Sequence, residues 1–194
     1  SARRGTGGGA KGGTGMTQTV FDDLEQIQRR PGMYIGNSGV TGMRTFLDGY
    51  RMAVGLGSRR LCTKNGIPLD YLHYYIARNY RQSASMGWAN ILREAAGSEQ
   101  GGLELFFREL EGFKAITILK VEEPLLTPEA RQMYLVTLSD GATLLVVERE
   151  GGLRVEFNSL FSQGEPKREL ERRFGPLEWR LSGEDFLGEK VLAI

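Results

Sequence analysis

Few residues in this chain could carry acid–base or nucleophilic chemistry. The sequence contains one histidine, His73, and one cysteine, Cys62. A Cys-His or Ser-His-Asp site needs the histidine beside its nucleophile, and nothing in the sequence fixes that geometry. One cysteine and one histidine also cannot supply the four ligands of a structural zinc site. We therefore expect His73 to be a structural residue, and the chain to hold no metal and no cofactor.

Adjacent carboxylates are the other candidates for acid–base work. A general acid needs a raised pKa, which requires apolar surroundings. The three pairs fall instead at predicted helix starts or strand ends, where charges are normally solvated: Asp22 with Asp23, Glu122 with Glu123, and Glu184 with Asp185. We therefore predict that the protein is not an enzyme. An enzyme would show a polar cleft that gathers Asp48, His73 and several arginines around a small molecule.

The strongest candidates for binding are tyrosines and arginines in one short stretch. Both residue types are enriched at protein interfaces, and together they can also contact nucleic-acid backbone and bases. The balanced charge of the chain favours a protein partner over nucleic acid. The predicted partner-binding residues are Tyr71, Tyr74, Tyr75, Arg78 and Arg81.

Composition limits the class of protein. The chain has 194 residues, with 25 Lys and Arg against 24 Asp and Glu, and a formal net charge of +1. The charges are balanced, so no excess of positive charge is present that would indicate binding to nucleic acid or to a membrane surface. No apolar run approaches the ~20 residues that cross a bilayer. One cysteine cannot form an internal disulfide, which favours a reducing compartment. We therefore expect a cytoplasmic protein, and the lack of a long apolar run predicts no membrane partner.

The domain organisation follows from the distribution of apolar residues. Residues 1–15 are rich in glycine and contain no large apolar side chain, so we expect a disordered tail. The remaining residues, 16–194, have the length and composition of a single domain. We expect its helical part to extend to about residue 112 and a mainly β part to follow.

Apolar residues at three- and four-residue spacing predict the helices of the first part. Thr19 is placed to cap the first helix, and Pro31 with Gly32 is placed to end it. Gly97 is placed to close the fourth helix. The predicted helices cover residues 20–30, 41–56, 68–80, 87–96 and 98–113.

The apolar pattern changes after Gly112. Asp140 followed by Gly141, between two β-branched and apolar runs, is the strongest hairpin signal in the chain. The predicted strands cover residues 115–122, 133–139, 143–149 and 153–157, followed by a helix at 165–174 and a strand at 177–181. The fold class is therefore α+β, with a layer of about five helices packed on a C-terminal antiparallel meander.

One run of seven residues resembles a known family. It is formed by Arg30, Pro31, Gly32, Met33, Tyr34, Ile35 and Gly36. With the short helix before it, this run resembles the N-terminal arm of the ATPase subunits of gyrase B and topoisomerase IV, over about residues 21–36. The resemblance implies a divergent nucleotide-binding protein. A local interpretation is that Pro31 and Gly32 turn the chain while Met33, Tyr34 and Ile35 fill the core.

The ATP chemistry of that family is not matched by the rest of the sequence. The family carries a general base and a magnesium-binding Asn on the next helix, and an Asp that reads adenine. Here the corresponding stretch, 45–50, lacks the Glu and Asn spacing, and Lys64 stands near the place of the adenine-reading Asp. We therefore do not expect ATP hydrolysis.

The order of motifs along the whole chain is similar to that of uncharacterised bacterial proteins that act as immunity proteins beside toxins. We therefore predict a non-catalytic, protein-binding domain, an immunity or antitoxin-like inhibitor that occludes a partner such as a toxin domain. The alternatives are a divergent gyrase B-like nucleotide-binding protein, and a nucleic-acid-binding module that uses Arg78 and Arg81.

Overall fold

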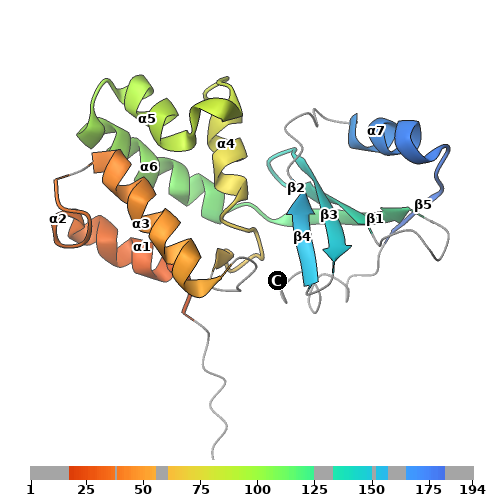
Figure 1. The fold of residues 1–194 in the computed structure, drawn as a ribbon, viewed down its shortest axis with the longest axis horizontal. Helices are drawn as coiled ribbons and strands as arrows, with labels where there is room; N and C mark the ends of the chain where they lie inside the picture. Colours follow the sequence, from red (N-terminus) through yellow and green to blue (C-terminus); the bar gives the residue numbers. More distant parts are fainter. Residues whose placement is uncertain are drawn as a thin grey trace, which may run out of the picture.

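The computed structural model describes residues 18–37, 39–55, 61–124, 133–149, 152–156 and 165–181. The predicted tail, 1–15, lies outside these residues. Figure 1 shows a helical part and a β-sheet lying side by side, with one further helix over the sheet. The α+β class and the N-to-C order of the two parts are as predicted. No helix among these residues has the length and apolar character needed to cross a membrane.

Seven helices and five strands make up the described elements. The helical part contains α1 (Val20–Arg29), α2 (Pro31–Tyr34), α3 (Gly39–Val54), α4 (Tyr71–Asn79), a 3-10 turn (Ala84–Met86), α5 (Trp88–Ala96) and α6 (Glu99–Lys114). The second part contains β1 (Ile118–Pro124), β2 (Met133–Leu138), β3 (Thr143–Arg149), β4 (Gly152–Glu156), α7 (Glu165–Phe174) and β5 (Trp179–Leu181). The five long N-terminal helices and the five strands match the predicted elements to within a few residues.

Two boundaries differ from the prediction. The chain after α1 forms the one-turn helix α2, with Pro31 at its first position, rather than a simple turn. Proline suits that position because a backbone N–H there would have no partner in the helix, so its absence from proline costs no hydrogen bond. The predicted third helix begins at Tyr71, not near Pro68. Pro68 lies in an isolated β-bridge with Cys62, and the N–H of Leu69 donates to the carbonyl of Leu61 at 2.7 Å instead of entering the helix.

The start of α3 depends on a side chain from another helix. The carboxylate of Glu99, at the start of α6, accepts hydrogen bonds from the Thr41 N–H at 3.0 Å and from the Thr41 hydroxyl at 2.8 Å. These bonds satisfy N–H groups that the first turn of a helix leaves unpaired. Gly39 permits the contact: it has a φ of +59°, and a Cβ there would lie 2.6 Å from the Glu99 backbone carbonyl oxygen.

The junction between α5 and α6 follows the sequence signals. Gly97 ends α5 in the left-handed conformation, as predicted, and the Ser98 hydroxyl accepts the Gly101 N–H at 3.0 Å at the start of α6. Gly102 then lets α6 approach its neighbours closely, because a Cβ there would lie 2.8 Å from Val40 and 3.1 Å from the backbone of Arg93. The core at this junction includes Trp88 and Phe106, whose ring centroids lie 5.0 Å apart.

The sheet has the strand order β4-β3-β2-β1-β5, and every neighbouring pair is antiparallel. The predicted turn at Asp140 and Gly141 is confirmed, with Gly141 at a φ of +84°. Alternate residues of the central strands face opposite sides. Leu135 and Leu145 pack with Leu170 of α7, whereas Val136 and Leu144 belong to the same core cluster as the helices.

Hydrogen bonds to acidic side chains make the stability depend on pH. The Thr41 N–H lowers the pKa of Glu99 below its ordinary 4.5, and the Thr19 N–H lowers that of Asp22 below 3.8. A group with a lowered pKa stabilises the fold fully above its unfolded-state pKa, and this contribution is lost as the pH falls through the folded-state value. We therefore expect the melting temperature to fall as the pH drops below about 4.5.

This pH dependence can be assigned by substitution. Glu99→Gln should lower the melting temperature at neutral pH and make its fall in acid shallower. Glu94→Gln, on the exposed side of α5, is the matched control and should change the melting temperature at neutral pH only slightly. Thermal unfolding followed by circular dichroism from pH 7 to about 3 measures both. An identical acid branch in Glu99→Gln and wild type would contradict the assignment.

Candidate functional site

Four of the residues predicted to bind a partner lie on α4 and Arg81 lies just after it, but the five do not form one surface. Tyr71 and Tyr75 are buried in the core. The ring of Tyr75 packs edge-on against Phe113 of α6, and its hydroxyl lies 2.5 Å from where a Cβ on Gly112 would be. Neither Tyr71 nor Tyr75 can meet a partner in this fold. Tyr74 is half-buried and Arg81 is exposed.

Arg78 and Tyr71 instead join the helical part to the sheet. The Tyr71 hydroxyl donates to the Asp140 carboxylate at 2.7 Å, and Arg78 donates to the same oxygen. The other oxygen accepts the Ala142 N–H at 3.0 Å within the turn. Burial and the bond to Asp140 raise the pKa of Tyr71 well above its ordinary value, so the phenol remains protonated. This group of side chains has a structural role.

His73 lies on α4 with both ring nitrogens in hydrogen bonds. Its Nε2 bonds to the Ala84 carbonyl, which must accept, so Nε2 carries the proton. Its Nδ1 is then the acceptor of the Trp88 N–H at 3.3 Å. The ring thus fixes the 3-10 turn and the start of α5 against α4. This is the structural role that the sequence predicts for the single histidine.

The thiol and the carboxylate pairs are in environments that oppose catalysis. Burial raises the pKa of the Cys62 thiol to about 11, so the reactive thiolate is scarce at neutral pH. Asp22 accepts from the Thr19 N–H at 2.8 Å, and Glu122 and Glu123 form ion pairs with Lys167 and Arg180. These carboxylates are therefore used in the structure, whereas the sequence suggested simple solvation. Glu184 and Asp185 lie outside the described residues.

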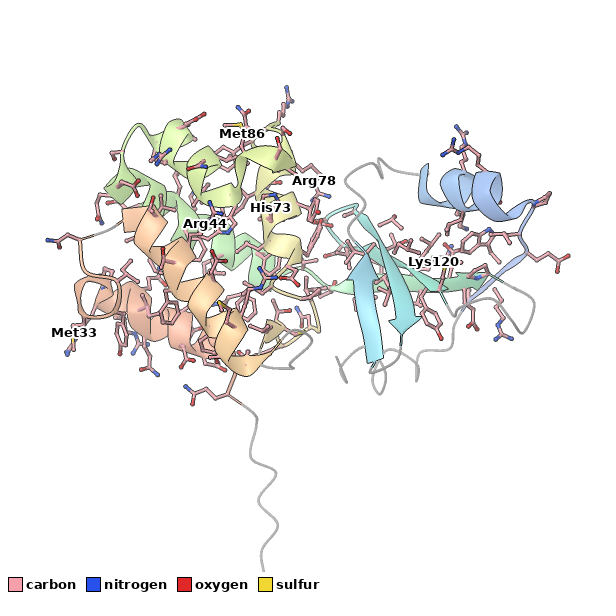
Figure 2. The ribbon with its side chains drawn as sticks, in the orientation of Figure 1. Met33, Arg44, His73, Arg78, Met86 and Lys120 are labelled. Atoms are coloured by element: carbon pink, nitrogen blue, oxygen red, sulfur yellow. The ribbon has the colours of Figure 1, made fainter. Side chains whose placement is uncertain are left out.

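The structure contains a charged cavity that is lined by two residues named in the sequence analysis, Asp48 and His73. It has a volume of about 180 Å³ and lies between α3, α4 and the start of α5. Its other charged lining residues are two arginines of α3, Arg44 and Arg51, and Asp70. Figure 2 labels Arg44 and His73 on the two helices that flank it. The spacing of Arg44, Asp48 and Arg51 along α3 places them on one face, a signal that sequence reasoning did not use.

The segment that resembles the gyrase B arm forms an exposed corner. Only Ile35 is buried; Met33 is 72% exposed and Tyr34 is 49% exposed. The expectation that all three side chains fill the core is therefore wrong for Met33 and Tyr34. A one-turn helix turns only one side to the core, and Ile35, whose N–H donates to the Pro31 carbonyl at 2.9 Å, takes that side. Figure 2 shows Met33 pointing away from the helices.

The rest of the run surrounds this corner. Arg30 links α1 to α2, and Gly32 and Gly36 are exposed, with nothing within 4 Å of a Cβ added at either. Gly36 has a φ of +60°, which glycine adopts without strain. The two glycines thus allow the turn and its exit.

A groove of about 400 Å³ begins at the same corner and lies along α6. Pro31, Leu103 and Phe107 are its apolar lining residues, and two glutamines and three charged side chains complete it: Glu104, Arg108 and Glu111. Leu103 and Phe107 are themselves buried, so the groove offers a partner mainly its polar and charged side chains. The exposed corner is too short to show a period. The α6 residues that line the groove do recur at helical spacing, but this signal was used only to predict the helix.

Within the described ranges, no group of three or more His, Cys, Asp or Glu side chains could hold a metal ion. Comparison of the chain with protein-family models, with curated proteins and with solved structures found no match. The geometry of the site therefore has to carry the functional argument.

Proposed function

We propose that this chain is a non-catalytic protein-binding domain that occludes a partner protein, as an immunity or antitoxin-like inhibitor does. The observation that carries the proposal is the exposed pair Met33 and Tyr34 on α2, held beside the groove along α6. We call α2 and this groove together the corner surface. It differs from the α4 residues predicted from the sequence, of which Tyr71 and Tyr75 are buried.

The side chains of the corner surface are of the kind that contribute most to binding. Methionine and aromatic residues are enriched at interfaces, and exposed apolar side chains that lie together mark binding sites more often than isolated ones do. A methionine also adapts to the shape of a partner's pocket. Met33 and Tyr34 are adjacent in the chain and follow the groove residue Pro31 by two and three residues.

The backbone of the corner is fixed before binding. Proline restricts φ at Pro31, and buried Ile35 anchors the other end of α2. A fixed backbone reduces the conformational entropy that binding would otherwise remove. The corner surface can therefore bind without an ordering step at α2.

Three features support the absence of catalysis. The Cys62 thiol is protonated at neutral pH, because burial raises its pKa. The charged cavity does gather Asp48, His73 and two arginines, the set expected of an enzyme cleft, but His73 uses both ring nitrogens within the fold and so offers none for proton transfer. The pKa of Glu122 is lowered, because hydrogen bonds from Lys120 and Lys167 outweigh the opposing effect of burial, and a general acid needs the reverse.

Substitution of the corner tests the proposal. Met33→Asp with Tyr34→Asp places two charges on the surface without removing a buried side chain, so the fold should persist. Loss of central apolar contacts typically costs about 2 kcal/mol or more, which is roughly a 30-fold loss of affinity. We expect the tagged double variant, expressed in the source organism, to lose the partner that wild type retains in quantitative affinity purification.

Met52→Asp is the matched control. Met52 lies on α3 and is 86% exposed, so it is a more exposed methionine outside the corner surface. The control should retain the partner in wild-type amounts. Equal recovery of every co-purifying protein by wild type and the double variant would rule out the corner surface as the binding site.

A further inference from the structure

The charged cavity between α3 and α4 suggests a second binding activity, independent of the corner surface. The two sites share no lining residue. Four charged side chains line the cavity, Arg44 and Arg51 against Asp48 and Asp70, so their formal charges cancel. A site whose positive and negative charges cancel favours a ligand that also carries one positive and one negative group.

Two of these charges and the histidine already have partners. Arg51 forms an ion pair with Asp70 at 2.6 Å through its terminal nitrogen, although its buried Nε has no hydrogen-bond partner, and His73 uses both ring nitrogens. Arg44 and Asp48 form a looser ion pair along α3: the Arg44 Nε lies 3.7 Å from the Asp48 carboxylate, too far for a hydrogen bond. Within the described ranges no hydrogen bond to either side chain is present. Both are about half exposed at the cavity.

This pair of side chains selects the charges of a ligand. The guanidinium of Arg44 presents a planar set of N–H donors that matches a carboxylate. The Asp48 carboxylate lies close enough to repel a simple anion bound there, unless the anion also carries a positive group. Because Arg44 and Asp48 lie one helical turn apart, they match a carboxylate and an ammonium group joined by a short linker.

The volume and the remaining walls limit the rest of the ligand. A cavity of about 180 Å³ holds the equivalent of about six water molecules at roughly 30 Å³ each. It is smaller than the ~300 Å³ typical of the smallest drug-sized sites. Leu47, Leu69 and Trp88 supply apolar walls. We propose that the cavity binds a free α-amino acid with an aliphatic side chain, its carboxylate on Arg44 and its ammonium on Asp48.

Titration with matched ligands tests the need for both charges. The full-length, isotope-labelled protein is titrated by NMR with L-leucine, with 4-methylpentanoate, which lacks the ammonium, and with 3-methylbutylamine, which lacks the carboxylate. L-leucine should give saturable shifts at Trp88 and at neighbouring residues of α3. Each single-charge analogue should bind at least about tenfold more weakly than L-leucine. No saturable shift with L-leucine would overturn the proposal, and so would equal binding of 4-methylpentanoate, which would indicate a simple anion site.

Variants test the assignment of the two groups. Arg44→Gln and Asp48→Asn should each weaken L-leucine binding by about tenfold or more. Arg93→Gln is the matched control, because Arg93 on α5 is exposed to a similar degree but does not line the cavity. Unchanged affinity in Arg44→Gln, or an equal loss in Arg93→Gln, would contradict the assignment. The analogue titration remains decisive if a variant does not fold.

Discussion

Replacing Asp140 with alanine should lower the free energy of unfolding by about 2–4 kcal/mol. Asp140 lies in the β2–β3 turn, and its side chain is only 12% exposed. The substitution removes the acceptor for the Tyr71 hydroxyl, for Arg78 and for the Ala142 N–H. We expect most of the cost at Tyr71 and Ala142, because the Arg78 side chain is 42% exposed and partly exposed ion pairs contribute less.

Two further variants make this expectation specific. Asp140→Asn keeps an acceptor oxygen for the turn and should cost less than the alanine variant. Glu111→Ala removes an exposed carboxylate that forms an ion pair with Lys114, and should change stability by less than about 0.5 kcal/mol. Urea unfolding measures all three. If Asp140→Ala proves no more destabilising than Glu111→Ala, the two parts of the fold are not joined through Asp140.

Gly39→Ala should destabilise the fold by about 3 kcal/mol or more. Its φ of +59° disfavours any residue with a Cβ, and that Cβ would lie 2.6 Å from the carbonyl oxygen and 2.7 Å from the carbonyl carbon of Glu99. Backbone atoms cannot rotate away as a flexible side chain can. The start of α6 would have to move, which would also disturb the bonds between Glu99 and Thr41.

Gly49→Ala is the matched control on the same helix. Nothing lies within 4 Å of a Cβ added at Gly49, and its φ is not positive. Alanine in an exposed helix interior is favoured over glycine, so this variant should raise the free energy of unfolding by about 0.5–1 kcal/mol. Chemical denaturation of both variants separates the close contact from helix propensity. Similar changes in the two variants would show that Gly39 is not constrained by Glu99.

The sequence was a good guide to secondary structure because the strongest local signals agree with the tertiary fold. The turn at Asp140 and Gly141, the capping residue Thr19 and the helix-ending Gly97 all act where they were predicted to act. These signals depend on backbone geometry over a few residues. The start of α4 at Tyr71 was harder to predict, because the bridge between Cys62 and Pro68 depends on pairing with a segment several residues earlier in the chain.

The burial of two tyrosines of α4 was not predicted, for a physical reason visible in the helix period. Tyr71 and Tyr75 are four residues apart and follow the same face as Leu72 and Ile76. Tyrosine suits both a core and an interface, and here the 3.6-residue period places these two rings in the core. The exposure of Met33 could not be predicted, because α2 is too short to show a period.

Part of the charged cavity was predictable and part was not. Arg44, Asp48 and Arg51 recur at helical spacing, so one face of α3 could be assigned from the sequence. Asp70 and His73 approach that face only through the packing of α4 on the helical core. The resemblance to the gyrase B arm stays a prediction, and a change of melting temperature with ATP and Mg²⁺ would support it.

Site-specific photo-crosslinking in the source organism tests the central claim most directly. A photoreactive phenylalanine analogue is placed at Met33, at Glu104 on the groove rim, or at Met52 as the control, and the adducts are identified by mass spectrometry. Our account predicts that positions 33 and 104 capture the same protein and that position 52 does not. Absence of a shared adduct at 33 and 104, or the same adduct from all three positions, would contradict binding through the corner surface.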